Sequence, residues 1–218
     1  MLRKIRRIIG NAEHVTTISD EHIYEENEKS YTGGSLAGSN VLIVSNIRKK
    51  LDSLELLENT LNIEQCGIIK RCLISDMDKK SIDEQLGNIE ESKFEHIINW
   101  VENISGNEGY VNCDVKLLYF LLQAECNYLI SNGSYGTICT AIISDMETDT
   151  SFEAEVCGMK SLINGLGYFM PKHEIIVNGV LAEQYIPLEE IIHTIIYLSG
   201  KYGQILTGEV LRMEKRKG

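Results

Sequence analysis

The hydrophobic pattern of this 218-residue chain alternates between two periods, and that alternation constrains the fold more than any other feature. Short apolar runs rich in β-branched residues are typical of buried strands, whereas apolar residues that recur every three or four positions are typical of helices. Strand-like runs occupy residues 15–18, 41–44, 68–74, 96–98, 137–143, 174–177 and 205–213. Helical spacing lies between them, at 49–61, 115–129, 152–169 and 188–198. About seven strands separated by helices predict an α/β fold with a doubly wound parallel sheet that helices cover on both faces.

Composition narrows the classes of function. The chain carries 32 Asp and Glu against 21 Lys and Arg, a net charge of -11, which argues against nucleic acid as a partner. No apolar run reaches the ~18 residues that a membrane span needs. The absence of Cys-x-x-Cys pairs and of His pairs at helical spacing predicts no metal site, and six free thiols suit the cytoplasm. With no break in composition, we expect one domain over residues 14–218 after a basic lead-in at 1–13.

Several segments of the chain, taken in order, resemble the short-chain dehydrogenase/reductase family. Residues 175–180 (Ile-Ile-Val-Asn-Gly-Val) are similar to that family's strand I-R-V-N-x-I, and residues 206–211 (Leu-Thr-Gly-Glu-Val-Leu) to its closing I-T-G-Q-x-L. Residues 76–82 are similar to D-V-T-D-x-x-S-V, and 159–162 to S-K-A-A-L. Residues 41–51 resemble the second strand with its R-x-x-x-L continuation, which puts residues 15–19 at the first strand. The resemblance spans residues 14–213.

The resemblance implies a Rossmann-like sheet that binds NAD or NADP and transfers a hydride to or from a carbonyl or alcohol. It also implies a dimer or tetramer built on helices 115–129 and 152–169 and on the final segment 188–213. An alternative partner is an active homologue in a hetero-oligomer.

The residues expected at the cofactor depart from the family pattern. The glycine-rich turn after the first strand would fall at residues 19–28, which contain five carboxylates and no glycine. Asp76 takes the place of the family's adenine-contacting aspartate, although a helix N-cap is an equal explanation. Asn99 retains the first position of the family's N-N-A-G segment. Glu102 replaces its glycine, and we expect Trp100 to fill the vacated space.

The expected catalytic positions are also incomplete. In the family's Y-x-x-x-K motif, Lys160 is present but Val156 replaces the tyrosine, which removes the general acid/base. The serine position falls at Ile143 or Ser144 and the asparagine position at Asp114. The family's substrate loop is almost absent before Pro187. We expect Cys157 to be a buried helix thiol rather than a replacement nucleophile.

Three hypotheses follow. The first is a non-catalytic pseudo-enzyme that acts as a structural or regulatory subunit and binds no cofactor. The second is a divergent NAD(P)-dependent oxidoreductase for a small carbonyl or alcohol, in which Asp114, Ser144 and Lys160 supply the acid/base chemistry. The third is a sensor that holds a small ligand in the vacated pocket.

Overall fold

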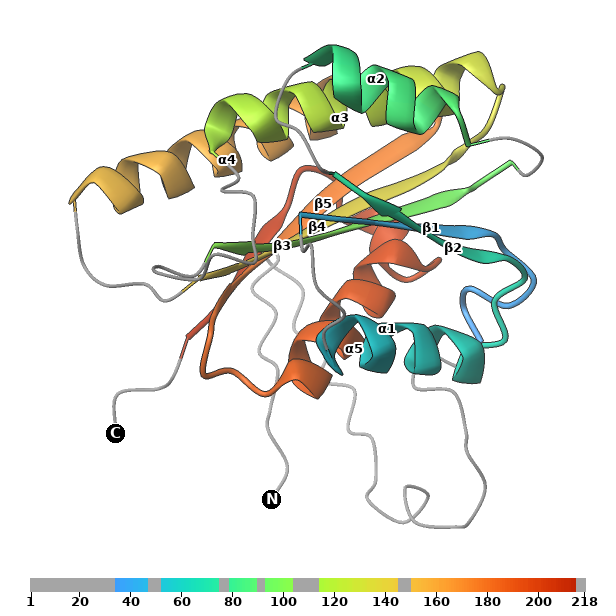
Figure 1. The fold of residues 1–218 in the computed structure, drawn as a ribbon, viewed down its shortest axis with the longest axis horizontal. Coiled ribbons are helices and arrows are strands. Elements are labelled where there is room, and N and C mark those ends of the chain that lie inside the picture. Colours follow the sequence, from blue (N-terminus) through green and yellow to red (C-terminus); the bar gives the residue numbers. More distant parts are fainter. Residues whose placement is uncertain are drawn as a thin grey trace, which may run out of the picture.

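Six strands form one parallel sheet in the computed structural model, which describes residues 34–46, 52–74, 79–89, 93–103, 114–144 and 150–214 (Figure 1). The spatial order is β2-β1-β3-β4-β5-β6, and every neighbouring pair is parallel. The strands are β1 (Val41–Ser45), β2 (Ile69–Leu73), β3 (His96–Asn103), β4 (Gly136–Ser144), β5 (Ile175–Glu183) and β6 (Val210–Met213). The helices are α1 (Asp52–Ile63), α2 (Lys79–Gly87), α3 (Val115–Ser131), α4 (Thr150–Phe169) and α5 (Leu188–Ser199), with 3-10 turns at Met170–His173 and Gly203–Ile205.

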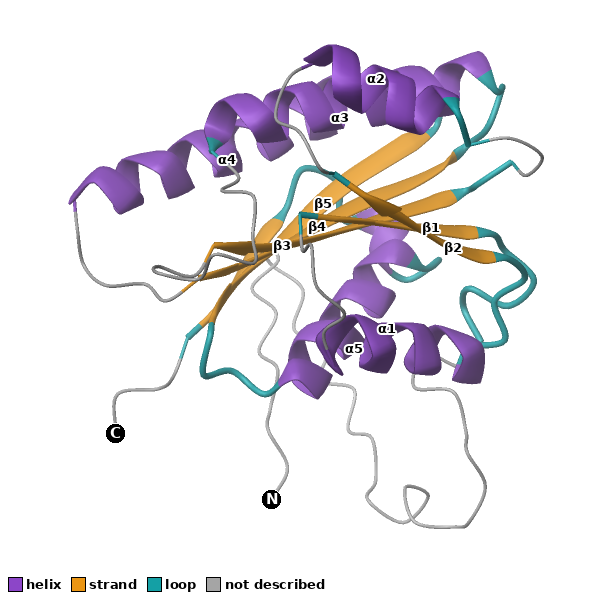
Figure 2. Ribbon diagram, in the orientation of Figure 1, coloured by secondary structure: helices purple, strands orange, loops and turns teal. Residues whose placement is uncertain are grey.

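Helices cover both faces of this sheet. Figures 1 and 2 show α2, α3 and α4 on one face and α1 and α5 on the other. Strands alternate their side chains between the two faces, so β3 sends Ile97 and Val101 into the core under α3 and Ile98 and Trp100 into the core over α1 and α5. All five residues of β1 and eight of the nine in β4 are buried, as expected for parallel strands covered on both sides.

The predicted α/β doubly wound class is confirmed, and six strands are described against about seven expected. The expected strand at 15–18 and the lead-in at 1–13 lie outside the described residues. Helix α2 was not predicted, because its short sequence carries only two buried apolar side chains, Ile82 and Leu86.

Three strands differ clearly in length from their predictions. Strand β5, expected at 174–177, extends to Glu183. Strand β3 continues to Asn103, so the segment 99–102 lies inside it rather than after it. The last is shorter, because Gly208 has a φ of +75° and donates its backbone N–H to the carbonyl of Val177 before β6 begins. That left-handed backbone interrupts the extended conformation that the apolar pattern suggested.

The place of β1 in the sheet locates the reversal of winding. The chain runs from β1 to β2 at one edge, then crosses back over β1 to β3 on its other side. Because β1 pairs with both β2 and β3, the winding direction reverses between β1 and β3. The connection from β1 to α1 begins next to this point, at Asn46. Residues 15–19, which were expected as the first strand, lie outside the described residues.

Among the helices of the described ranges, none combines the length and the apolar character needed to cross a membrane.

Candidate functional site

The reversal of winding between β1 and β3 locates the candidate site. In open α/β sheets, ligands bind outside the carboxyl ends of the strands at the point where the strand order reverses. Here that point lies beyond Ser45 of β1 and Glu102 of β3, next to the start of α1.

Asn46 bridges the two strands at this point. Its side-chain Nδ2 donates to the carbonyl of Glu102 over 2.9 Å, and its Oδ1 accepts from the backbone N–H of Glu102 over 3.0 Å. Asn46 is only 3% exposed. A buried side chain that bonds both backbone groups of the facing residue extends the parallel pairing by one position.

The side chain of Glu102 lies in the same place and connects β3 with α1. Its Oε1 accepts from Ser53 Oγ in the first turn of α1 over 3.1 Å and from Trp100 Nε1 over 2.8 Å. Glu102 is 6% exposed and Trp100 is fully buried. The expectation that Trp100 fills space at this position agrees with its burial, and its indole N–H has the partner that a buried tryptophan needs.

Figure 1 shows β1, β3 and α1 adjacent in this part of the molecule. The N-terminus of the helix after the first strand is the usual anion site of such folds, because its backbone N–H groups lack helical partners. In this chain a carboxylate of the protein, that of Glu102, already lies against the first turn of α1. The residues present therefore do not fit a pyrophosphate there unless Glu102 moves.

The segment between β1 and α1 differs in composition from the segment in which the cofactor turn was expected. Residues 46–51 read Asn-Ile-Arg-Lys-Lys-Leu, with no glycine and no carboxylate. The turn expected at residues 19–28, with its five carboxylates, lies outside the described residues. The carboxylate that lies against the first turn of α1 is that of Glu102.

The three expected catalytic residues have separate environments. Lys160 is exposed on α4, whereas Val156 is buried one turn earlier and packs into the core beneath α3. Ser144 is fully buried at the end of β4, and within the described ranges its Oγ has no hydrogen-bond partner. Asp114 is the N-cap of α3, and its Oδ1 accepts from the backbone N–H of Leu117 over 2.7 Å.

Asn99 points to the opposite face of the sheet from Trp100. Its Nδ2 donates to Glu125 of α3 over 2.9 Å and to Thr140 of β4 over 3.1 Å, so its amide belongs to the core. Asp76, the other expected cofactor residue, lies outside the described residues. The candidate site consists instead of Asn46, Ser53 and Glu102. The sequence signal for Asn46 was its place in a polar pair, Ser45 and Asn46, that directly follows the apolar run 41–44, and Ser53 gave no signal.

Other expectations concern single residues near the C-terminal half. Cys157 is exposed on α4, so the prediction of a buried thiol there was wrong. Its neighbours Val156 and Met159 take the buried face of the helix, and position 157 turns outward. The connection from β5 to α5 is only residues 184–187, with Pro187 as N-cap, as the missing substrate loop predicted. Over the described ranges, no group of three His, Cys, Asp or Glu side chains could hold a metal.

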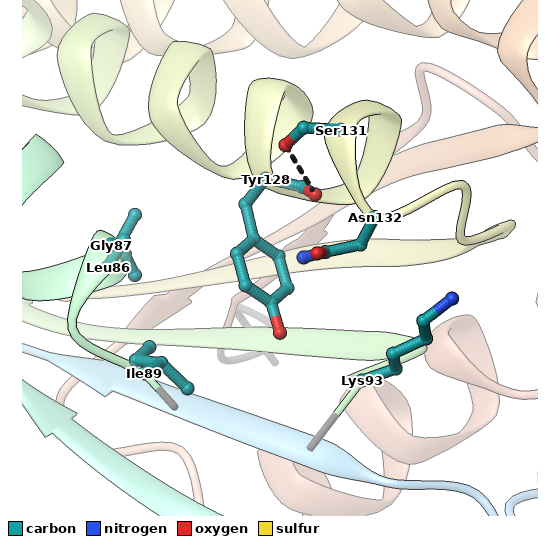
Figure 3. A pocket seen from close by; sticks show the side chains of 7 residues that line it. All are labelled: Leu86, Gly87, Ile89, Lys93, Tyr128, Ser131 and Asn132. Atoms are coloured by element: carbon teal, nitrogen blue, oxygen red, sulfur yellow. Dashed lines mark hydrogen bonds between the residues drawn. The ribbon is translucent and has the colours of Figure 1, made fainter. Parts of the chain in front are cut away.

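A pocket of about 350 Å³ lies elsewhere, between the C-terminal ends of α2 and α3 (Figure 3). Tyr128 and Asn132 of the α3 end face Ile89 and Lys93 across it. Lys93 precedes β3 whereas Glu102 lies near its end, so this pocket is at the amino edge of the sheet, away from the candidate site.

Comparison with known proteins gives matches in structure but not in sequence. No family model matches the chain, and neither does a curated protein sequence. The chain is similar to a short chain dehydrogenase from Mycobacterium smegmatis, with a TM-score of 0.63 at 12% identity over 85% of this chain and 95% of that one. It is also similar to a short chain dehydrogenase from Leptospira borgpetersenii solved with bound NAD+, with a TM-score of 0.63 at 12% identity over 91% and 98% of the two chains.

A third similar structure is a short chain dehydrogenase from Bacillus anthracis, with a TM-score of 0.57 at 20% identity over 86% of this chain and 91% of that one. The similarity to these three structures extends over 85–91% of this chain and 91–98% of theirs. The chain therefore has the fold of the short-chain dehydrogenases/reductases.

Proposed function

We propose that this chain is a non-catalytic protein of the short-chain dehydrogenase/reductase fold, a pseudo-enzyme that acts as a structural or regulatory subunit. The single observation that carries the proposal is the carboxylate of Glu102 against the first turn of α1, bonded to Ser53 and Trp100. A dinucleotide at this turn would meet a buried negative charge where its own negative phosphates belong, and like charges repel strongly in a site that excludes water.

The catalytic positions support the same proposal. Val156 can neither donate nor accept a proton, and its side chain is packed into the core. Lys160 is exposed, Asp114 caps a helix and the buried Ser144 hydroxyl makes no bond to either. The loss of the acid/base residue and the filling of the cofactor position occur together, as expected when a fold is retained without its chemistry.

Exposed apolar side chains on α3 and α4 support a role through subunit contacts. Tyr119 of α3 is 46% exposed, and Tyr168 and Phe169 at the end of α4 are 81% and 57% exposed. Large aromatic side chains in such positions are enriched at protein interfaces. We propose that the chain forms a dimer or tetramer, or pairs with an active homologue, through these helices.

The free thiols of the five described cysteines suit a place in the cytoplasm.

Sedimentation velocity tests the subunit role. We expect the purified chain to sediment as a dimer or larger species, and Tyr119→Asp together with Tyr168→Asp to shift it toward the monomer. Tyr135→Asp is the matched control, because Tyr135 is 67% exposed in the turn before β4 and lies on neither helix. A strictly monomeric chain that also captures no homologue from its source would contradict the subunit role.

One observation favours the alternative, a divergent NAD(P)-dependent oxidoreductase. In the sequence between β1 and α1 stand Arg48, Lys49 and Lys50, and cations attract phosphate. This alternative requires Glu102 to leave its bonds with Ser53 and Trp100 when the cofactor enters. Saturable binding of NADH or NADPH would support it and would remove the basis of the pseudo-enzyme proposal.

A further inference from the structure

A second buried polar cluster lies on the other face of the sheet, beneath α3. It consists of Asn99 from β3, Glu125 from α3 and Thr140 from β4, and all three are fully buried. The Nδ2 of Asn99 donates to Glu125 Oε2 over 2.9 Å and to Thr140 Oγ1 over 3.1 Å. The cluster lies on the opposite face of the sheet from Trp100 and Glu102. No residue of it has a part in the proposed function.

Among the described residues, one oxygen of each member of the Asn99–Glu125 hydrogen bond has no partner. These atoms are Asn99 Oδ1 and Glu125 Oε1, and both are buried. An amide carbonyl and an ionised carboxylate are acceptors only, so neither can satisfy the other. A protonated carboxyl differs, because one of its oxygens donates while the other accepts.

We propose that Glu125 carries a proton in the native fold and donates it from Oε1 to Asn99 Oδ1. The carboxyl and the amide then form a ring of two hydrogen bonds, in which Asn99 Nδ2 donates to Oε2 and the acid O–H donates to Oδ1. One proton thus satisfies both of the buried oxygens. Without it, the core would hold an ionised carboxylate. Burial of such an uncompensated charge strongly destabilises a fold.

Among the described residues, no charged group is found that stabilises the ionised form of Glu125. Glu125 itself acts on the thiols of Cys72 on β2 and Cys126 on α3, and burial raises the pKa of the first to about 11 and of the second to about 12. The charged side chains of α2 (Lys79, Lys80, Asp83 and Glu84) and Lys160 of α4 are exposed. Burial accordingly raises the pKa of Glu125 to about 8, against the opposing effect of the hydrogen bond from Asn99.

Unfolding as a function of pH tests this proposal. Below pH 4.5 the carboxyl is protonated in both states, and between pH 4.5 and 8 only the folded state holds the proton. Unfolding therefore releases one proton in this window, and stability falls as pH rises through it. We expect the unfolding equilibrium constant of the wild type, divided by that of Glu125→Gln, to rise about tenfold per pH unit between about pH 5 and 7.5.

Glu125→Gln keeps the shape of the side chain and can present N–H to Asn99 Oδ1, so it folds without needing the proton. Thr140→Val is the control, because it removes the other acceptor of Asn99 Nδ2 and leaves the pH slope of the wild type unchanged. A ratio that stays constant from pH 5 to 8 would overturn the proposal, since it would mean that Glu125 is ionised in the fold.

Infrared spectroscopy of the folded protein gives a second readout that does not depend on a variant that folds. We expect a carbonyl stretch of a protonated carboxyl at pH 7, which is lost on titration with a midpoint near pH 8. Where Glu125→Gln folds, the band is missing from it. A folded wild type that shows only carboxylate bands at pH 7 would contradict the proposal.

Discussion

Glu102 is the residue on which the proposed function depends, because its carboxylate lies against the first turn of α1. Its replacement of a glycine was visible in the sequence, as was the bulk of Trp100 beside it. The partners were not visible, because Asn46 and Ser53 lie 56 and 49 positions away in the chain. These partners depend on which of two apolar segments, 15–18 or 41–44, lies next to β3. Strand order is a property of tertiary packing, and hydrophobic periodicity does not encode it.

Removal of the Glu102 side chain tests its bonding at the scale of the residue. Glu102→Ala leaves the buried indole N–H of Trp100 and the Ser53 hydroxyl without an acceptor, so we expect a loss of about 2–4 kcal/mol in the free energy of unfolding. Glu102→Gln keeps an oxygen at the same position, and we expect it to cost less than about 1 kcal/mol. Urea denaturation measures both, and equal stability of the two variants would contradict the bonding described for Glu102.

The elements of the fold followed from the sequence to the extent that each has a long apolar stripe. Helix α3 begins at the predicted Val115 and carries eight buried residues, and β4 is buried along nearly its whole length. Helix α2 escaped prediction because two buried side chains in nine residues make a weak periodic signal. The start of the last strand was predicted too early, because at Gly208 a left-handed backbone interrupts the apolar run.

Contact between α3 and α4 is tested by two glycines of α4. A Cβ at Gly158 would lie 2.9 Å from Cγ2 of Val115 on α3, whereas a Cβ at Gly165 would have no atom within 4 Å. We expect Gly158→Ala to lower the free energy of unfolding by about 1–3 kcal/mol through overpacking.

Gly165→Ala is the matched control in the same helix. We expect it to raise stability by up to about 1 kcal/mol, because alanine favours a helix over glycine. Thermal denaturation of both variants measures the difference. If Gly158→Ala were as stable as Gly165→Ala, the close approach of α3 and α4 at this point would be refuted.

At the scale of the whole molecule, the fold and its chemistry separate. The overall fold matches structures solved as short chain dehydrogenases, with TM-scores of 0.57–0.63 at 12–20% identity for those compared. A fold is retained through apolar periodicity, which tolerates many substitutions of similar volume. A cofactor site depends on a few residues at single positions, and we propose that in this chain those positions hold Asn46, Glu102 and Val156.

The central claim is that the chain's own side chains occupy the candidate site beyond the carboxyl ends of β1 and β3. We therefore propose that this site does not bind a dinucleotide. Calorimetric titration of NADH and NADPH into the wild-type protein tests it most directly, at cofactor concentrations up to about 1 mM, which covers affinities down to about -4 kcal/mol. We expect no saturable heat with either cofactor. Saturable binding of one molecule per chain, accompanied by a change in the fluorescence of Trp100, would contradict it.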